Sequence, residues 1–326
     1  MDKYYIGIDI GGTKCAVVLA DESCDIIDKV IFLTETDKGV KYALTKIKEA
    51  VHYLIDNFIE DVNKIQSVGI SCGGPLDSIK GLILSPPNLP GWSNIAIVDI
   101  MEKEFNIATY LQNDANACAL AEWKFGAGKG YKNVIFLTFG TGMGAGLILD
   151  GRPYVGACDM AGEIGHIRIS ENGPVGYGKI GSFEGFCSGG GIAQIAKNYV
   201  LKELQKGNKV SFCNGIKNLE EINAQVVAEA AFKGDTLAKQ IYQEVGKYLG
   251  KGLSILIDML NPEAIVIGSI YTRSCELMKT SMETVLREEV LPQSLSTCKI
   301  LPAKLGENLG DIAAICVGME GVRANG

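Results

Sequence analysis

A glycine-rich turn near the start of the sequence has the composition of a phosphate-binding loop. Gly11-Gly12-Thr13-Lys14 follows the apolar segment 4–9. The glycines let backbone N–H groups approach phosphate oxygens, and the threonine hydroxyl and lysine ammonium add a donor and a positive charge. Asp9, at the expected end of a strand, can hold Mg2+ through water, because this ion retains several of its waters in proteins. By itself, the segment is explained equally well as a hairpin turn with a solvated lysine.

A second turn of the same kind lies in the middle of the chain. In Phe139–Gly146, four glycines alternate with other residues, which is more glycine than a hairpin requires. Two such turns can bind phosphates from two sides, so the pair is a stronger indication than either turn alone. The first turn lacks the GxxxxGK[ST] spacing, so it is not a P-loop.

An aspartate stands where one strand is expected to end and a helix to start. In Asn113-Asp114-Ala115-Asn116, both residue types are favoured N-caps, so the simplest explanation is a helix cap. Two amides and a carboxylate together exceed what one cap requires. Asp114 can instead accept a proton from a hydroxyl while the amides hold neighbouring hydroxyls, as a general base in phosphoryl transfer does.

One of the two histidines lies in a glycine-rich segment, Gly162-Glu163-Ile164-Gly165-His166. The other, His52, is on an amphipathic segment and is expected at the surface. A hydrogen-bonded structural histidine would explain His166 alone. Glu163 beside it favours a carbohydrate site, in which several polar groups converge on sugar hydroxyls.

The elements that must position these residues occur twice. In each half, the pattern of apolar and β-forming residues predicts a unit of three successive strands with a glycine turn after the first. Further strands are expected outside these two units. The expected strands are 4–9, 16–20, 26–33, 67–71 and 107–111, then 134–139, 145–149, 153–155, 264–267 and 299–302. A duplicated unit of this kind predicts two similar domains with a cleft between them, into which each turn points its N–H groups.

Helices are expected between and after these strands. Apolar residues at helical spacing predict helices at 40–58, 117–125, 192–204, 223–232, 237–259 and 309–319. The chain is therefore expected to be an α/β protein. Its smaller domain is expected to comprise residues 1–116 plus about 305–326, and its larger domain residues 117–304.

Composition excludes several broad classes. The 326 residues, 47% hydrophobic and 21% charged, indicate a two-domain globular protein. A net charge of −7 argues against a broad nucleic-acid-binding face. No apolar run approaches the roughly 20 residues of a membrane span, and the N-terminal residues lack a signal-peptide pattern, so a cytoplasmic location without membrane attachment is expected. Ten scattered cysteines without a CxxC pair favour reduced thiols.

Together, these motifs resemble the ROK family of sugar kinases and sugar-responsive repressors, within the actin–hexokinase superfamily. The matching segments, in chain order, are DIGGTK (Asp9–Lys14), GGP (Gly73–Pro75), NLPGW (Asn88–Trp92), NDANACALAE (Asn113–Glu122), FGTGMGAGLILDG (Phe139–Gly151) and AGEIGH (Ala161–His166). The resemblance implies two actin-like (ribonuclease-H-like) domains, ATP and Mg2+ as cofactors, a sugar substrate and a homodimer.

The resemblance also implies a role for each site residue. Asp114 would be the catalytic base and would contact the sugar. The other sugar-binding residues would be Gly74, Asn88, Asn113, Glu163, His166 and Glu184. ATP would be bound by Gly11, Gly12, Thr13, Lys14, Thr141 and Gly142, with Gly268 and Ser269 bordering the adenosine and Asp9 helping to hold Mg2+.

The sequence departs from the family at a metal-binding loop. Family members usually carry CxCGxxGCxE after the GH motif, and its three cysteines bind structural zinc with the GH histidine. Here Val175, Tyr177 and Ser182 replace the cysteines, while the glycines and the glutamate survive. We therefore expect no structural zinc. Packing by apolar side chains is expected to anchor the loop instead, namely those of Tyr177, Ile180 and Phe183.

Two further motifs match only in part. The adenosine-side segment, usually glycine-rich, reads Gly268-Ser269-Ile270, which leaves the nucleotide preference open. The near-terminal motif is partly kept in Gly310-Asp311-Ile312-Ala313-Ala314.

The expected activity is ATP-dependent phosphorylation of a hexose, with glucose and its 6-hydroxyl expected first. Kinases for N-acetylmannosamine, N-acetylglucosamine, allose and fructose share these motifs, so the sugar stays open. Family repressors carry a winged-helix domain ahead of DIGGTK; only eight residues precede Asp9 here, so an enzyme is expected. A catalytically inactive sugar-binding protein is disfavoured because the catalytic aspartate and the sugar-binding side chains are retained.

Overall fold

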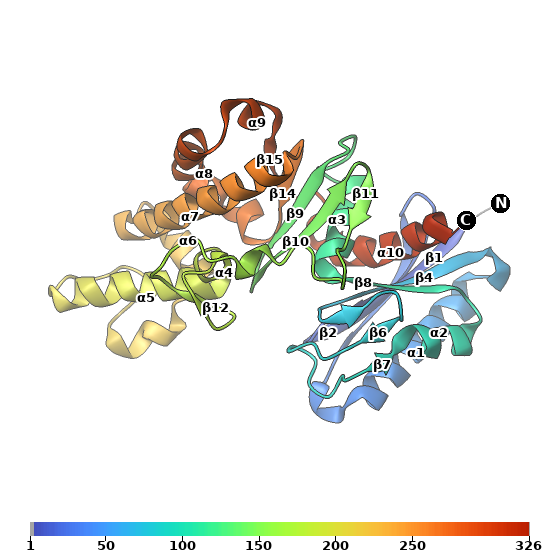
Figure 1. The fold of residues 1–326 in the computed structure, drawn as a ribbon. Coiled ribbons are helices and arrows are strands. Elements are labelled where there is room, and N and C mark those ends of the chain that lie inside the picture. The colour runs from blue at the N-terminus through green and yellow to red at the C-terminus, as the bar shows by residue number, and fades with distance from the viewer. Residues whose placement is uncertain (1–2, 326) are drawn as a thin grey trace.

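Two α/β lobes make up the computed structural model, which describes residues 3–325 (Figure 1). Each lobe is built on a five-stranded sheet. The first sheet has the order β3-β2-β1-β4-β8, formed by β1 (Tyr4–Ile10), β2 (Lys14–Asp21), β3 (Ile26–Leu33), β4 (Ile65–Cys72) and β8 (Thr109–Asn113). The second has the order β11-β10-β9-β14-β15, formed by β9 (Val134–Phe139), β10 (Met143–Leu149), β11 (Arg152–Tyr154), β14 (Ala264–Ile267) and β15 (Lys299–Pro302).

The two sheets have the same topology. In each, the first three strands pair antiparallel, and the fourth and fifth strands add parallel beside the first. The three-strand unit that the sequence predicts twice is therefore confirmed, and the structure adds that the fourth and fifth strands also repeat. The main difference is β8, which lies two residues later than expected, so that it ends at Asn113, directly before Asp114.

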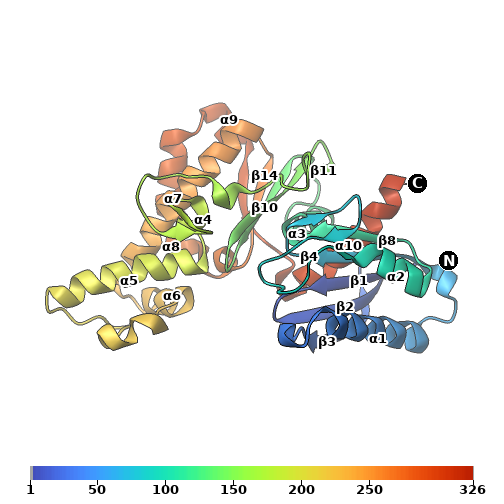
Figure 2. The same cartoon turned by 60° about the horizontal axis from the view of Figure 1, so that its bottom comes forward.

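Helices cover both faces of the first sheet. One face carries α1 (Val40–Phe58) and α2 (Ile97–Phe105), which lie side by side in Figure 2. The apolar stripe of α1 is buried at Ala43, Ile47, Val51 and Leu54, as its helical spacing predicts. The other face carries α10 (Leu309–Asn325), which packs on β1 and β4.

Helices α10 and α3 (Asp114–Lys124) join the lobes. The two helices pack against each other, and α3 also packs on β9 and β10 of the second sheet. Gly146 permits this approach, because a Cβ there would lie 2.3 Å from the carbonyl oxygen of Ala115. The residue that begins α3 is thus fixed relative to both sheets.

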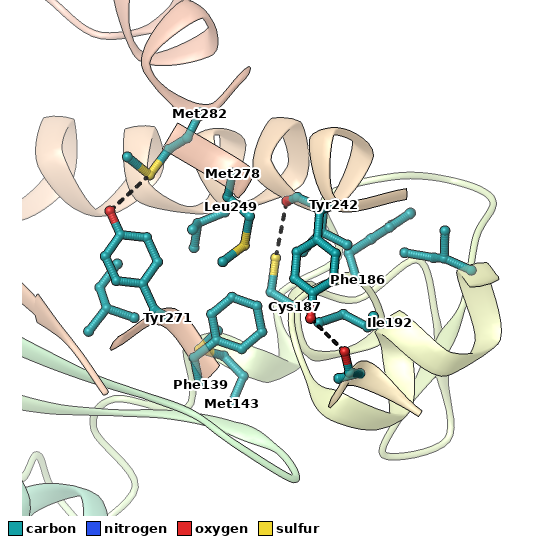
Figure 3. Packing of buried hydrophobic residues seen from close by; sticks show 14 of the residues in the cluster. Phe139, Met143, Phe186, Cys187, Ile192, Tyr242, Leu249, Tyr271, Met278 and Met282 are labelled. Atoms are coloured by element: carbon teal, nitrogen blue, oxygen red, sulfur yellow. Dashed lines mark hydrogen bonds between the residues drawn. The ribbon is translucent and has the colours of Figure 1, made fainter. Parts of the chain in front are cut away.

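The second lobe buries a larger helical core. Its helices are α4 (Phe183–Phe186), α5 (Gly189–Gln205), α6 (Ala224–Phe232), α7 (Thr236–Leu260), α8 (Ile270–Glu289) and α9 (Pro292–Thr297). Figure 3 shows part of this core, in which Tyr242 donates a hydrogen bond to the carbonyl of Ala224 at 2.8 Å. Helices α5, α6 and α7 match the helices expected at 192–204, 223–232 and 237–259, whereas α8 was not expected from the sequence.

Shorter elements complete the fold. A small sheet, β5 (Leu76–Asp77), β6 (Leu82–Ile83) and β7 (Ile95–Ala96), extends the first lobe, and a hairpin, β12 (Val175–Gly176) and β13 (Lys179–Ile180), extends the second. The 3-10 helices are η1 (Thr36–Lys38), η2 (Val62–Lys64), η3 (Ile164–His166), η4 (Ile216–Glu221) and η5 (Gly306–Asn308). Among residues 3–325, none of the helices combines the length and the apolarity that crossing a membrane requires.

Candidate active site

Asp114 is the first residue of α3 and follows β8 directly. Asn113 is the N-cap of the helix, and its Oδ1 accepts a hydrogen bond from the backbone N–H of Ala115 at 3.0 Å. Asp114 Oδ1 accepts from the same N–H group at 2.8 Å. Solvent reaches the aspartate side chain. The cap is therefore supplied by Asn113, and the carboxylate of Asp114 stays accessible.

The pKa of the Asp114 carboxyl is raised above its ordinary value. Enclosure by the surrounding protein is the main cause, and it acts although solvent still reaches the side chain; hydrogen bonds from the backbone of Ala115 and of Asp114 itself oppose it. A base with a raised pKa holds an accepted proton more firmly.

A second aspartate, Asp9, lies near the end of β1 and has a perturbed pKa. Burial raises the pKa of its carboxyl to about 6, and repulsion from Asp114 and Asp311 adds to the rise. A hydrogen bond with Ser71 and the charge of Lys14 oppose it. This net acidic environment suits a divalent cation. Mg2+ can be bound through a single carboxylate and its own waters, so Asp9 fits the role that the sequence suggests.

The first glycine turn joins β1 to β2. Gly11 N–H donates to the carbonyl of Lys14 at 3.1 Å, and the Thr34 hydroxyl donates to the carbonyl of Gly11 at 2.6 Å. A Cβ on Gly12 would lie 2.4 Å from the carbonyl oxygen of Asn88, so only glycine fits there. The turn is held from two sides, and the side chains of Thr13 and Lys14 remain exposed.

The second glycine turn joins β9 to β10. Gly140 N–H donates to the carbonyl of Gly142 at 3.1 Å, and Gly189 N–H donates to the carbonyl of Gly140 at 2.8 Å. Thr141, at the tip, is exposed. The residues on either side of the turn, Phe139 and Met143, are buried in the core of the second lobe (Figure 3). The core of the second lobe therefore holds both ends of the turn in place.

Ser269 borders this second turn. A Cβ on Gly140 would lie 3.2 Å from the Ser269 hydroxyl. Gly268, at the end of β14, is buried, and Ser269 begins the turn into α8 with φ 54° and ψ −111°. That conformation is one that residues with a side chain rarely adopt. The pair Gly268-Ser269 thus lies beside the second glycine turn.

Glu184 connects the short helix α4 to the second turn. Its Oε2 accepts a hydrogen bond from the backbone N–H of Met143 at 3.0 Å, and a Cβ on Gly142 would lie 2.8 Å from the same oxygen. Glu184 lies on the short helix α4. Ser182 caps that helix by accepting from Gly185 N–H at 3.1 Å.

Glu163 is the N-cap of the short helix η3, His166 is its last residue, and both are solvent-exposed. Partial desolvation raises the pKa of the Glu163 carboxyl; repulsion from Asp114 and Glu184 adds to the rise, and the proximity of His166 opposes it. The three carboxyl groups therefore share one electrostatic environment, although their residues come from separate segments.

Three further residues that the resemblance assigns to sugar binding meet at the ends of β4 and β8. A Cβ on Gly74 would lie 3.1 Å from the Asn113 Nδ2 atom, and a Cβ on Gly73 would lie 3.3 Å from Asn88 Oδ1. Gly74, Asn88 and Asn113 therefore lie close together, beside Asp114.

The loop that usually binds zinc is a β-hairpin here. Tyr177 and Gly178 form its two-residue turn, with φ values of 46° and 74°. Ser182 donates to the carbonyl of Gly176 at 3.3 Å, and Gln194 bonds both the N–H (3.0 Å) and the carbonyl (2.9 Å) of Val175. Hydrogen bonds anchor the loop at these points.

The expectation that apolar packing anchors this loop is wrong for two of its three residues. Phe183 is fully buried, but Tyr177 is 75% exposed and Ile180 is 51% exposed. The Tyr177 ring meets the edge of the His166 ring at a centroid distance of 6.2 Å, and Lys179 Nζ donates to the His166 carbonyl at 2.8 Å. Within the described residues, no three His, Cys, Asp or Glu side chains are grouped to hold a metal ion.

Several contacts at the site were not identified from the sequence. Ser71 hydrogen-bonds Asp9, and Asp311, whose charge acts on Asp9, forms a partly buried ion pair with Lys29. Ser71 could have been identified from the sequence because it is a polar residue near the end of a largely apolar strand. Two of the four alternating glycines, Gly144 and Gly146, pack against α3, so part of the glycine signal reflects helix packing.

Comparisons with known proteins agree with this arrangement. The model of the ROK family matches residues 5–317. The glucokinase of Halalkalibacterium halodurans is 30% identical over 314 residues, which are 95% of this chain and 93% of that protein. The xylose repressor of Caldicellulosiruptor bescii is 29% identical over 318 residues, 95% of this chain and 77% of that protein.

A solved structure gives the same result for the fold. The ROK family glucokinase from Streptomyces griseus, in complex with glucose and AMPPNP, superposes with a TM-score of 0.77 at 28% identity, covering 97% of this chain and 99% of that chain. The two-domain, actin-like α/β fold that the sequence predicts is confirmed.

Proposed function

Because the chain belongs to the ROK family, we propose that it is an ATP-dependent sugar kinase that phosphorylates a hexose, with glucose as the acceptor at its 6-hydroxyl. The glucokinases of H. halodurans and S. griseus support glucose, and AMPPNP in the latter structure supports ATP. The xylose repressor shows that similar chains also serve in sugar-dependent regulation.

The position of Asp114 is the observation that carries the proposal. Asp114 and Asp9 are close enough for their charges to repel, and Asp9 adjoins the first glycine turn. Ala115, the residue after Asp114, lies against β10, since a Cβ on Gly144 would be 3.7 Å from the Cβ of Ala115. A base at this point lies near the first turn and beside β10, the strand that follows the second turn; both turns are proposed to hold ATP.

In the proposed reaction, Asp114 accepts the proton of the sugar hydroxyl while that oxygen attacks the γ-phosphorus of ATP and ADP leaves. The raised pKa of Asp114 favours acceptance of this proton. N–H groups of the two turns and the Lys14 ammonium would stabilise charge on the phosphoryl oxygens. Bound Mg2+ would neutralise phosphate charge, and Asp9 is the residue that would hold it, through water.

The sugar would be oriented by residues from both lobes. Asn88 and Asn113 would contribute amides from the first lobe, and Glu163, His166 and Glu184 would contribute charged or polar groups from the second. Orienting the acceptor hydroxyl next to its base lowers the entropic part of the barrier.

A coupled assay of ADP release with a panel of sugars tests the proposal. We expect ADP release that depends on glucose, with glucose 6-phosphate as the product identified by mass spectrometry and NMR. The same preparation of Asp114→Asn gives the background rate. ADP release at background level for every sugar of the panel would overturn the assignment as a kinase.

The panel also decides between the alternatives for the substrate. N-acetylmannosamine, N-acetylglucosamine, allose and fructose are the other acceptors to include. If an N-acetylated hexosamine has the highest kcat/KM, the chain is a kinase for that sugar. Sugar binding in calorimetry without turnover would instead indicate a sugar-binding regulator.

We also expect a cytoplasmic homodimer, and light scattering of the purified protein measures the oligomeric state.

A further inference from the structure

A pair of hydrogen bonds connects the two lobes through residues that do not belong to helices α3 and α10. Ser78 lies in the turn between β5 and β6 of the first lobe, and Asp159 lies between β11 and η3 of the second. The Ser78 backbone N–H donates to Asp159 Oδ2 at 2.8 Å, and the Ser78 hydroxyl donates to Oδ1 at 2.7 Å. Both carboxylate oxygens are used, and both residues are partly buried.

The backbone of Asp159 is held in an unfavourable conformation. Its φ is 58°, in the left-handed region that favours glycine. Its neighbours Cys158 and Met160 are exposed, so core packing does not impose this conformation. A left-handed residue that persists in a surface segment indicates a compensating interaction. The two bonds to Ser78 are that interaction.

The two bonded residues lie next to the sugar-binding residues of opposite lobes. Ser78 follows Gly74 by four residues, and Asp159 precedes Glu163 by four residues. Each segment is also fixed within its own lobe. Leu84 N–H donates to the Pro75 carbonyl at 3.1 Å, and Ala145 N–H donates to the Gly162 carbonyl at 2.9 Å. The bonds between Ser78 and Asp159 therefore constrain the distance between Gly74 and Glu163.

We propose that Ser78 and Asp159 form a tether between the lobes that limits how far they separate and so favours the arrangement that binds the sugar. Both are positioning residues, which act on the sugar through Gly74 and Glu163. The role in sugar binding rests on the proposed function. A tether that favours the binding-competent arrangement lowers the apparent Kd of the sugar by the increase in the competent fraction. Once sugar is bound, the arrangement is the same with or without the tether, so kcat is expected to change little.

Three variants test the tether. Asp159→Gly removes the carboxylate and also relieves the left-handed strain, so its folding is preserved. Ser78→Ala removes one of the two donors and keeps the backbone N–H. Ser211→Ala is the matched control, because the Ser211 hydroxyl donates to Asp235 at 2.6 Å within the second lobe alone.

We expect Asp159→Gly to raise the KM of the best sugar about tenfold, as loss of hydrogen bonds to a charged acceptor predicts. Its kcat and its KM for ATP should stay within about twofold of the wild type. Ser78→Ala should change the sugar KM in the same direction by a smaller factor, and Ser211→Ala should not change it. Melting curves confirm that each variant is folded.

Small-angle scattering of the ligand-free proteins separates the tether from the enzyme activity. We expect a larger radius of gyration for Asp159→Gly than for the wild type and for Ser211→Ala. An unchanged sugar KM in Asp159→Gly would overturn the positioning role, and unchanged scattering would overturn the tether itself. If the wild type phosphorylates no sugar, the proposed function fails, and the scattering comparison still decides whether the lobes are tethered.

Discussion

At the scale of single residues, two neighbouring side chains divide the tasks at the start of α3. Asn113 has the extended backbone of an N-cap, and its side chain satisfies the N–H of Ala115. Asp114 lies one residue further, inside the first turn, where a negative charge is favoured by the helix dipole. The cap and the proposed base are therefore different residues, which can be separated by mutation.

We expect Asp114→Ala to lower kcat by a factor on the order of 10²–10⁴ or more, because a general base contributes about that much and the same carboxylate orients the hydroxyl. Sugar affinity should fall only modestly. Asp114→Asn keeps the shape of the side chain and should lose as much kcat. Because solvent reaches Asp114, neither change leaves a cavity, and the melting temperature should change little. Turnover above about a tenth of the wild type in Asp114→Ala would contradict its role as base.

The raised pKa of Asp114 has a direct consequence for the pH profile. The base acts only when it is ionised, so kcat/KM should fall as the pH drops through the raised pKa of Asp114. This pKa lies above the ordinary value of 3.8. Since the folded-state pKa is raised, this ionised carboxylate also costs stability above that pKa, and the cost disappears as the pH falls. A kcat/KM that stays flat down to the ordinary aspartate pKa would contradict the expectation.

Ser269 has a backbone conformation that costs of order 1–3 kcal/mol for a residue with a side chain. Ser269→Gly should therefore raise the melting temperature, while Ser269→Ala, which retains the strain, should not. If the hydroxyl borders the nucleotide as proposed, both variants should raise the KM for ATP. Thermal melts and initial rates at varied ATP measure both effects. A Ser269→Gly variant that melts no higher than the wild type would show that the position is not strained.

Short-range pattern explains why some site residues were predictable and others were not. The glycine turns, Asp114 and the segment around Glu163 each place their chemical groups within a few neighbouring residues. The bond between Ser78 and Asp159 spans 81 residues, and neither residue type is unusual in a polar loop. The unusual φ of Ser269 depends on the turn from β14 into α8, which its own sequence does not indicate.

At the scale of elements, the two sheets were predictable and some helices were not. Most strands of the sheets are largely apolar runs bounded by turn residues, so their signal is local. Helix α8 was missed for two reasons. Ser269 precedes it without a side-chain cap, so the usual start signal is absent. The helix is also rich in charged residues, and it buries only one stripe, at Tyr271, Ser274, Met278, Met282, Val285 and Leu286.

The hairpin of β12 and β13 leads to a prediction about metal content. Valine cannot ligate zinc, and Ser182 uses its hydroxyl to bond Gly176 and Gly185. Elemental analysis of protein purified without chelator should find no stoichiometric zinc, and a chelator should not reduce the melting temperature. A substitute site with Cys158 and Cys187 is disfavoured, because Cys187 is fully buried. Stoichiometric zinc that depends on His166 would contradict the prediction.

At the scale of the whole molecule, Glu122 holds together the two places where the chain crosses between the lobes. It is fully buried on α3, and its Oε2 accepts from Ala127 N–H at 2.7 Å, just after the first crossing. Its Oε1 accepts from Lys304 and Leu305 N–H groups, each at 2.9 Å, on the return crossing between β15 and α10. This carboxylate therefore links the two crossings, and we expect the hinge between the lobes to lie there.

Glu122→Gln should destabilise the protein by about 3 kcal/mol, because an amide nitrogen would face backbone N–H groups and leave buried donors unsatisfied. Chemical denaturation measures the loss. Glu220→Gln is the control, since Glu220 is largely exposed and pairs only with Lys197 at the surface, where such pairs contribute little. A Glu122→Gln variant as stable as the Glu220→Gln control would mean that the hinge does not need the carboxylate.

The division of the site between two lobes leads to an expectation for the motion of the whole molecule. The proposed sugar-binding groups come from β4, β8 and their loops in the first lobe and from η3 and α4 in the second. A bound sugar can therefore draw the lobes together, and closure would exclude water, which competes as a phosphoryl acceptor. We expect the radius of gyration to fall when the best sugar is added, and to fall less with ATP alone. Scattering at saturating sugar, at saturating ATP–Mg2+ and with both measures this order.

The tether limits how far the free lobes separate, so the decrease in the radius of gyration on adding sugar should be larger in Asp159→Gly than in the wild type. Equal scattering of free and sugar-saturated protein in both variants would show that the lobes are already fixed in one arrangement.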